Sequence, residues 1–287
     1  MSKFLTDAAV QEFDSEVKHE YQGTKSLRDT VTIRTGVVGD AYKFTRMGKG
    51  LANQKASQAD VTPMDISHGR QTANLENWNA PEYTDIFDQA EVNFDEKSEL
   101  ATVIAKALGR REDQLVIDAL ASVTFAATND ENPDTGRVFD ISGTRNFDLS
   151  AIRSAAAHLD DIEADEADRH LVMRSQAMAK LLEDSTVTSS DFNSVKALIN
   201  GELDTFMGFK FHKIGTRKEG GLPGVAADRE AFAYHKSAIG LAIGMDMKTT
   251  VDWIAQKTSW LANGMFKAGA IAREAQGIVK IQYNETI

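Results

Sequence analysis

The sequence predicts an α+β fold in which strands come from both ends of the chain. Segments with the period-two alternation typical of strands lie on both sides of a block that mixes helical and strand patterns. One long helical pattern, residues 94–122, separates the early strands from that block. With 287 residues the chain is long for one compact core, so we expect either one domain with an insertion or two closely joined subdomains.

Composition excludes several classes of function. The chain carries 32 basic and 43 acidic residues, a net charge of −11, which disfavours tight binding to the phosphates of nucleic acid. It has no cysteine, which excludes disulfides, thiolate zinc sites, iron–sulfur clusters and thiol catalysis. The first residues, MSKFLTDAAVQEFDSE, are polar and acidic, so we expect no signal peptide, and no apolar run is long enough to span a bilayer. We therefore predict synthesis in the cytoplasm and no membrane partner.

The first 30 residues predict a short amphipathic helix on an otherwise extended arm. Such an arm packs either on its own core or on a neighbouring molecule. The apolar residues at helical spacing are Val10, Phe13, Val17 and Tyr21.

The next segments predict broken strands followed by a long loop. Residues 31–47 alternate as strands do, with breaks at Gly36 and Gly39. Residues 48–76 are almost devoid of large apolar side chains, so they cannot form a core of their own. We expect a protruding loop or hairpin there, and long loops of this kind are usually functional.

An aromatic segment, ENWNAPEYTDIFD, follows this loop at residues 76–88. It places Trp78, Tyr83 and Phe87 within ten positions, and it has no helical period. Pro81 and the nearby asparagines argue against a regular strand through its centre. Three large aromatic side chains on an irregular segment predict a surface that the segment covers.

The strongest helical pattern spans residues 94–122. Asn93 is a candidate N-cap, with Glu96 three residues later in a capping-box arrangement. Gly109 is a candidate bend. One apolar stripe runs along the helix through Leu100, Val103, Ile104, Ala107, Leu108, Leu115 and Ala119.

The rest of the chain predicts further helices and strands. Asp148 or Ser150 caps a second helix, and Ser175 opens a third that continues to Leu182. Strands are expected at HLVM (170–173) and at FMGFKFHKI (206–214), where Phe209 and Phe211 lie on one side. A flexible loop is expected at 215–224 and an alternating segment at 231–244. Long strands are expected over 251–283, where Val279, Ile281 and Tyr283 share one face.

A search for chemistry finds no catalytic, metal or cofactor site. None of the six histidines has metal-ligand spacing, and phosphate-binding and nucleophile-elbow motifs are absent. The acidic run at 160–168 lacks the glycine of a calcium loop, which favours a solvated helix end. Residues 248–260 hold two tryptophans beside two lysines. They fit a nucleic-acid stacking site less well than a strand with buried tryptophans and solvated lysines. We predict that the protein is not an enzyme and uses no cofactor.

Two long stretches carry a family resemblance. They are NWNAPEYTDIFDQAEVNFDEKSELATVIAKALGRREDQLVIDAL (77–120) and AYHKSAIGLAIGMDMKTTVDWIAQKTSWLANGMFKAGAIAREAQGIVKI (233–281). Together with MGFKFHKI they resemble the major capsid proteins of tailed bacteriophages, which have the Hong Kong 97-type fold. The resemblance implies an N-terminal arm, an extended loop, a peripheral domain with a long spine helix, and an axial domain. The implied boundaries are 1–43 for the arm and first strand, 44–84 for the extended loop, 85–134 for the peripheral domain, with its spine helix at 94–122, 135–250 for the axial domain, and 251–287 for a return to the peripheral domain.

The resemblance also implies the partners. Copies of the chain would form hexamers and pentamers of an icosahedral head shell in the virion, around double-stranded DNA that is bound without sequence specificity. We expect a separate scaffolding protein, because the arm begins close to Met1, and a portal. We also expect shells without covalent cross-links. The candidate contacts between subunits are Phe13, Tyr21, Trp78, Tyr83 and Phe87.

Three other interpretations remain open at this point. An encapsulin-like compartment shell would have the same fold and would package enzyme cargo. A soluble α+β enzyme would use scattered carboxylates at its site, but it leaves the arm and the polar loop unexplained. A virion decoration protein would not need the long helix.

Overall fold

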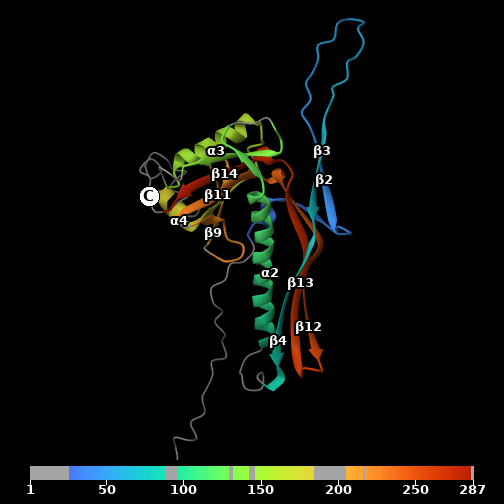
Figure 1. The fold of residues 1–287 in the computed structure, drawn as a ribbon, viewed down its shortest axis with the longest axis vertical. Helices are drawn as coiled ribbons and strands as arrows, with labels where there is room; N and C mark the ends of the chain where they lie inside the picture. Colours follow the sequence, from blue (N-terminus) through green and yellow to red (C-terminus); the bar gives the residue numbers. More distant parts are fainter. Residues whose placement is uncertain are drawn as a thin grey trace, which may run out of the picture. The chain divides into compact units, whose positions relative to one another are not determined.

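In the computed structural model (Figure 1), the chain forms two compact units. The first includes Asn77–Gly109 and Met247–Phe266, and the second comprises Lys25–Glu76, Arg110–Asp246 and Lys267–Ile287. The structure describes residues 26–87, 96–128, 132–141, 146–183, 205–215, 217–225 and 227–285.

An eight-stranded mixed sheet forms the centre of the second unit. Its strand order is β5-β6-β14-β11-β7-β9-β8, with β10 paired to β11. Parallel pairs join β5 to β6, β6 to β14, and β7 to β9. The strands are β5 (Thr124–Ala126), β6 (Thr135–Asp140), β7 (Arg169–Arg174), β8 (Thr205–Phe206), β9 (Phe209–Ile214), β10 (Gly224–Val225), β11 (Asp228–His235) and β14 (Ile278–Asn284).

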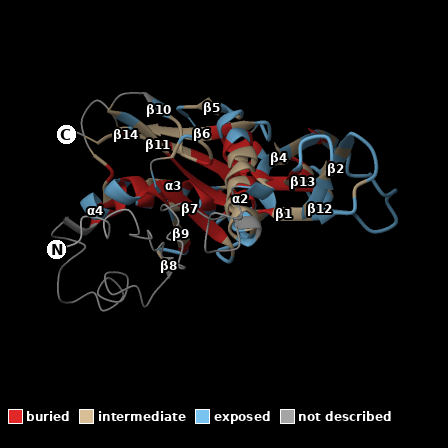
Figure 2. Ribbon diagram, turned by 90° about the horizontal axis from the view of Figure 1, so that it is seen from below, coloured by how far each residue is buried: buried red, intermediate tan, exposed pale blue. Residues whose placement is uncertain are grey.

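Helices α3 (Leu149–Asp161) and α4 (Ser175–Glu183) pack on this sheet over a large hydrophobic core. Asp148 caps α3, because its side chain accepts a hydrogen bond from Ala151 N. Figure 2 shows buried residues along α3 and the neighbouring strands. The core includes Ile152, Ala155 and Leu159 from α3, Leu171 and Met173 from β7, Phe209 from β9, with Phe211 packed against it, and Val279, Ile281 and Tyr283 from β14.

These elements confirm several local predictions. Strand β7 coincides with the HLVM segment and is buried along its whole length. Phe209 and Phe211 both pack on the core, as the alternation predicted. The membership of β14 differs from our expectation for 251–287, because β14 pairs with β6 and β11 in the eight-stranded sheet. Alternation predicts which face of a strand is buried, but not which sheet the strand joins.

A four-stranded sheet has the order β1-β12-β13-β4. Its strands are β1 (Thr32–Thr35), β4 (Glu76–Asp85), β12 (Ile239–Ile254) and β13 (Ser259–Ala272). The prediction against a strand at 76–88 was wrong, since β4 runs through Pro81. A proline is tolerated there because β4 is the last strand of the sheet and, among the described strands, pairs on one side only.

The long helix α2 spans Glu96–Ala121. Its candidate cap, Asn93, lies outside the described residues. Within the first unit, Ile104 and Leu108 lie so close to β13 that a Cβ at Gly264 would overlap both side chains. Further along, the predicted stripe was incomplete. Leu115 is only partly buried, whereas the polar pair Glu112 and Asp113 is buried with Val116, Ile117 and Leu120.

Strands β2 (Ala41–Met47) and β3 (His68–Asn74) form an antiparallel hairpin, which Figure 1 shows as two adjacent strands joined by a long connection. Residues 48–67, the hairpin tip, contain no regular secondary structure. Three short 3-10 turns complete the described structure: η1 (Arg28–Thr30), η2 (Lys236–Ala238) and η3 (Ala275–Gly277).

Candidate functional site

The three predicted contact residues near β4 do not share one environment. Tyr83 is 44% exposed and Phe87 is 70% exposed. Trp78 is half-buried and lies on the opposite face of β4, the face on which Thr84 is buried. The structure therefore presents Tyr83 and Phe87, but not Trp78, on an exposed surface. The other two candidates, Phe13 and Tyr21, lie outside the described residues.

Exposed apolar side chains from β12 occur in the same compact unit. Val251 is 39% exposed and Trp253 is 42% exposed. The prediction of a buried tryptophan at 253 was therefore wrong. Trp253 packs edge-on against Trp260, with ring centroids 5.3 Å apart. We call the exposed set Tyr83, Phe87, Val251 and Trp253 the tip surface.

A lysine lies beside the tip surface. The Lys257 ammonium is 3.8 Å from the centroid of the Tyr83 ring, within the range of a cation–π interaction. Thr258, the next residue, has a positive φ of 53° in the turn between β12 and β13. The tip surface thus presents large aromatic side chains, the residue type that is enriched at protein interfaces, beside one lysine, a residue type more common at an interface rim.

The hairpin tip is a second exposed apolar region. Leu51 is 82% exposed, and Met47, Val61 and Met64 are also exposed. Within the described residues, these side chains have no core of their own, because residues 48–67 are otherwise polar. The loop predicted from composition is therefore found in the structure.

The root of the hairpin, in contrast, is buried. Phe44, Ala73, Leu75 and Ala242 form a small core. Phe44 packs directly on Gly240, where an added Cβ would lie 2.6 Å from the ring. The hairpin therefore leaves the second unit from a fixed base.

Polar contacts also hold the root. Arg46 donates a hydrogen bond to Pro133 O (3.2 Å) and pairs with Asp134 (2.9 Å), which also accepts from Gln71 Nε2 (2.9 Å). On the other side, Lys267 Nζ lies 2.6 Å from Asp40 Oδ1, and this hydrogen bond lowers the pKa of the Asp40 carboxyl. These contacts anchor the root of the hairpin within its own subunit.

Asp113 forms a buried junction on α2. Its carboxylate accepts hydrogen bonds from Ser26 N (3.0 Å), Leu27 N (3.0 Å) and Arg217 Nη2 (3.0 Å). The junction therefore joins the start of the described chain and the 217–221 loop to the long helix. Sequence reasoning missed this residue, because a lone aspartate among helical charges predicts solvent exposure.

The 217–221 loop is held more firmly than we predicted. Gly220 N donates to Gln114 Oε1 (2.7 Å), and Gly220 has a positive φ of 69°. A Cβ at Gly220 would lie 2.7 Å from Arg110 O. Only glycine allows this backbone to lie so close to α2.

Two histidines meet on adjacent parallel strands. His170 Nδ1 lies 3.0 Å from His212 Nε2, and His170 is buried. Burial, followed by the neighbouring His212 and Lys210, lowers the pKa of His170 to about 4. Sequence spacing could not reveal the pair, since the pairing of β7 with β9 joins positions 42 residues apart.

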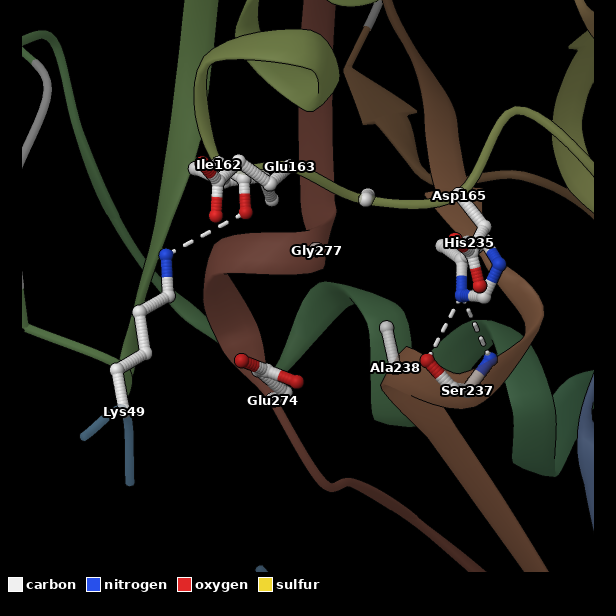
Figure 3. Close-up of a pocket in the computed structure, with 10 residues that line it drawn as sticks. Lys49, Ile162, Glu163, Asp165, His235, Ser237, Ala238, Glu274 and Gly277 are labelled. Carbon is white, nitrogen blue, oxygen red and sulfur yellow. Dashed lines mark hydrogen bonds between the residues drawn. The ribbon is translucent and has the colours of Figure 1, made fainter. Parts of the chain in front are cut away.

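The pocket in Figure 3 is the feature most relevant to an enzyme interpretation. It has a volume of about 280 Å³ and is lined by carboxylates Glu163, Asp165 and Glu274. His235 Nδ1 lies 2.7 Å from Ser237 Oγ and also accepts from Ser237 N, while its Nε2 lies 3.1 Å from Ala167 O. His235 therefore caps the η2 turn, which is a structural role.

The described residues offer no metal centre or membrane span. They contain no group of three or more metal-ligating side chains. Among the described helices, none is long and apolar enough to cross a bilayer. The features that stand out are exposed apolar surfaces rather than a chemical site.

The family model for phage capsid proteins matches residues 5–285. The chain belongs to the phage capsid protein family. Because the match covers nearly the whole chain, the protein is a major capsid shell protein, and its place is the virion capsid. The predicted family is thereby confirmed, and structural rather than catalytic work is the general role of such proteins.

Solved capsid structures have the same fold. The capsid protein of the cyanophage P-SCSP1u is 18% identical, with a TM-score of 0.75 over 99% of this chain and 95% of that chain. The head structure of Helicobacter pylori bacteriophage KHP40 gives 10% identity and a TM-score of 0.75, covering 97% and 96%. The capsid of a native GTA particle gives 17% identity and a TM-score of 0.73, covering 99% of each chain. No curated protein matches this capsid protein. The predicted α+β capsid fold is confirmed.

Proposed function

We propose that this capsid protein assembles into hexamers and pentamers that form an icosahedral head shell around a double-stranded DNA genome. The observation that carries the proposal is the family match over residues 5–285. Exposed apolar side chains in both compact units support it, because repeated contacts between copies would cover them.

The tip surface and the hairpin tip are the proposed contacts between subunits. Phe87 and Leu51 are the most exposed large side chains of the two regions. Burying such a side chain contributes about 1.5–3 kcal/mol, and a shell repeats each contact many times. Trp78 is proposed as an internal anchor for β4, since it is half-buried on the other face.

The structural units take proposed domain roles. The hairpin β2–β3 with its tip corresponds to the extended loop, and α2 corresponds to the spine helix. The first unit takes the peripheral role, and the eight-stranded sheet of the second unit takes the axial role.

Further partners follow from this proposal. A separate scaffolding protein and a portal would guide assembly. The net charge of −11 would let packaged DNA lie near the wall without sequence-specific binding, provided that the acidic residues face inward. The protein would be made in the host cytoplasm before it joins the shell.

The test is direct observation of assembly. The purified protein is sized by light scattering and imaged by negative-stain electron microscopy, with and without co-expressed scaffolding protein. Closed shells or capsomer rings are the expected result. A uniform small oligomer under both conditions would overturn the proposal.

Three serine variants test which surfaces make the contacts. Phe87→Ser and Leu51→Ser should slow shell formation at least tenfold while far-ultraviolet circular dichroism stays unchanged. Val38→Ser is the matched control, because Val38 is 97% exposed and lies outside both surfaces. Equal assembly by all three variants would contradict the assignment of the contacts. Trp78→Ala should lower the stability of the isolated subunit, which separates anchoring from contact.

A further inference from the structure

The outer edge of β12 is open over its second half. Strand β1 pairs only with Gly240–Ile243, and β13 lies on the other side. Figure 1 shows the far ends of β12 and β13 side by side. In the part of the chain that the structure describes, residues 248–254 therefore pair with a strand on one side only. An open edge presents unpaired backbone groups that attract another strand.

The direction of these backbone groups follows from one hydrogen bond. Val37 N donates to Ile243 O (3.1 Å), so the Ile243 carbonyl faces the outer edge. Along a strand this direction recurs at every second residue. The N–H and C=O groups of Thr249, Val251 and Trp253 therefore point outward from the sheet edge.

The two faces of this segment of β12 carry different kinds of side chain. One face carries Lys248, Thr250 and Asp252, with Ile254 at its end. The other face carries Met247, Thr249, Val251 and Trp253, of which Val251 and Trp253 are exposed apolar side chains. Charge and apolar surface are thus arranged symmetrically about Thr250.

We propose that this edge pairs antiparallel with the same edge of a second copy, around a two-fold axis at Thr250. The proposal rests on the proposed function only in that the partner is another copy of this chain. Lys248 then faces Asp252 of the partner subunit, and the reverse pair forms at the same time. On the other face, Trp253 lies opposite Met247 of the partner subunit. Cross-strand pairs of both kinds stabilise antiparallel sheets.

Other registers lose this complementarity. If the two-fold axis lay at Lys248, the lysines of the two copies would lie opposite each other. If it lay at Asp252, the two aspartates would lie opposite each other. A shift by one residue leaves Lys248 opposite an uncharged side chain. The register at Thr250 is also the one in which the outward N–H and C=O groups of Thr249 and Val251 pair between copies.

The absence of native cysteine makes the register measurable. At the axis, the two Thr250 residues form a non-hydrogen-bonded pair with Cα atoms about 4.5 Å apart, which a disulfide can bridge. The two Thr249 residues lie more than about 7 Å apart, which is too far. Thr250→Cys should therefore give a disulfide-linked dimer on mild oxidation of assembled protein, and Thr249→Cys, the matched control, should give at least tenfold less.

Charge exchange tests the same register independently. In the Thr250→Cys background, Lys248→Asp should reduce cross-linking at least tenfold, and Lys248→Asp with Asp252→Lys should restore it. Equal cross-linking at 249 and 250, or a cross-link from 250 to another segment identified by mass spectrometry, would overturn the pairing. Shells that form without the 250–250 cross-link would also overturn it while leaving the proposed function intact. Failure of the unmodified protein to form shells counts against the proposed function instead.

Discussion

The eight-stranded sheet and the exposed surfaces of this protein differ in how completely their side chains and backbone groups are covered. Strand β7 is buried at every position and is paired on both sides. The hairpin tip, the tip surface and the outer edge of β12 leave large side chains or backbone groups uncovered within the described residues. The comparison teaches that one region is completed by its own chain, whereas the other is left for the neighbouring copies that we propose. Substitutions should separate the two regions cleanly.

The same leucine substitution should have unequal effects in the two regions. Leu171→Ala in β7 removes a fully buried side chain and should lower the free energy of unfolding by about 3–4 kcal/mol. Leu51→Ala at the hairpin tip should change it by less than about 0.5 kcal/mol. Denaturant unfolding of the unassembled subunit measures both, and similar losses would remove the basis of the comparison.

Stability of the sheet should fall as the pH is lowered. The pKa of His170 is about 4 in the folded protein, against 6.5 for an ordinary histidine. Between these values the unfolded chain binds more protons, so the free energy of unfolding should drop by up to about 3 kcal/mol from pH 6.5 to pH 4. Burial also lowers the pKa of His158, which acts in the same direction.

Variants isolate the contribution of His170 to this slope. His170→Gln should flatten the pH dependence of stability, leaving the part due to His158. His68→Gln on β3 controls for the loss of a histidine outside the eight-stranded sheet. A slope that is unchanged in His170→Gln would contradict the assignment.

The buried junction on α2 should be sensitive to charge. Asp113→Asn keeps the shape of the side chain but removes the charge that pairs with Arg217, so we expect a loss of about 2–3 kcal/mol. Asp118→Asn on the exposed face of the same helix is the matched control and should cost less than about 0.5 kcal/mol. Equal effects in thermal unfolding would show that burial does not set the difference.

The root of the hairpin should respond to a single methyl group. Gly240→Ala places a Cβ against the Phe44 ring and should destabilise the subunit by about 1–3 kcal/mol. Gly215→Ala has no heavy atom within 4 Å of the new Cβ and is the control. Faster proteolysis at the hairpin in Gly240→Ala alone would locate the effect. Identical proteolysis of the two variants would contradict the role assigned to Gly240.

Local patterns predicted the elements whose stability is local. The cap at Asp148, the alternation around Phe209 and the apolar run of β7 each depend on neighbours a few residues away, and each was found. The candidate contacts were predicted less well. Tyr83 and Phe87 are exposed, but Trp78 lies on the other face of a strand that Pro81 had argued against. Trp253 was predicted to be buried because it is a large aromatic residue on a strand. Its actual exposure depends on which other segments pack against that strand, and local sequence does not show this.

By itself, the sequence determined the α+β class, the long helix and the polar loop, because composition and periodicity record which faces must avoid water. The family followed from the resemblance of residues 77–120 and 233–281 to phage capsid proteins. Only the tertiary structure decided that β14 joins the eight-stranded sheet, that Asp113 is buried, that His170 meets His212 and that no other described strand pairs with the outer edge of β12 at residues 248–254. Each of these depends on contacts between residues far apart in the chain. Such contacts leave no spacing pattern in the sequence, since they form only when separate strands and helices pack.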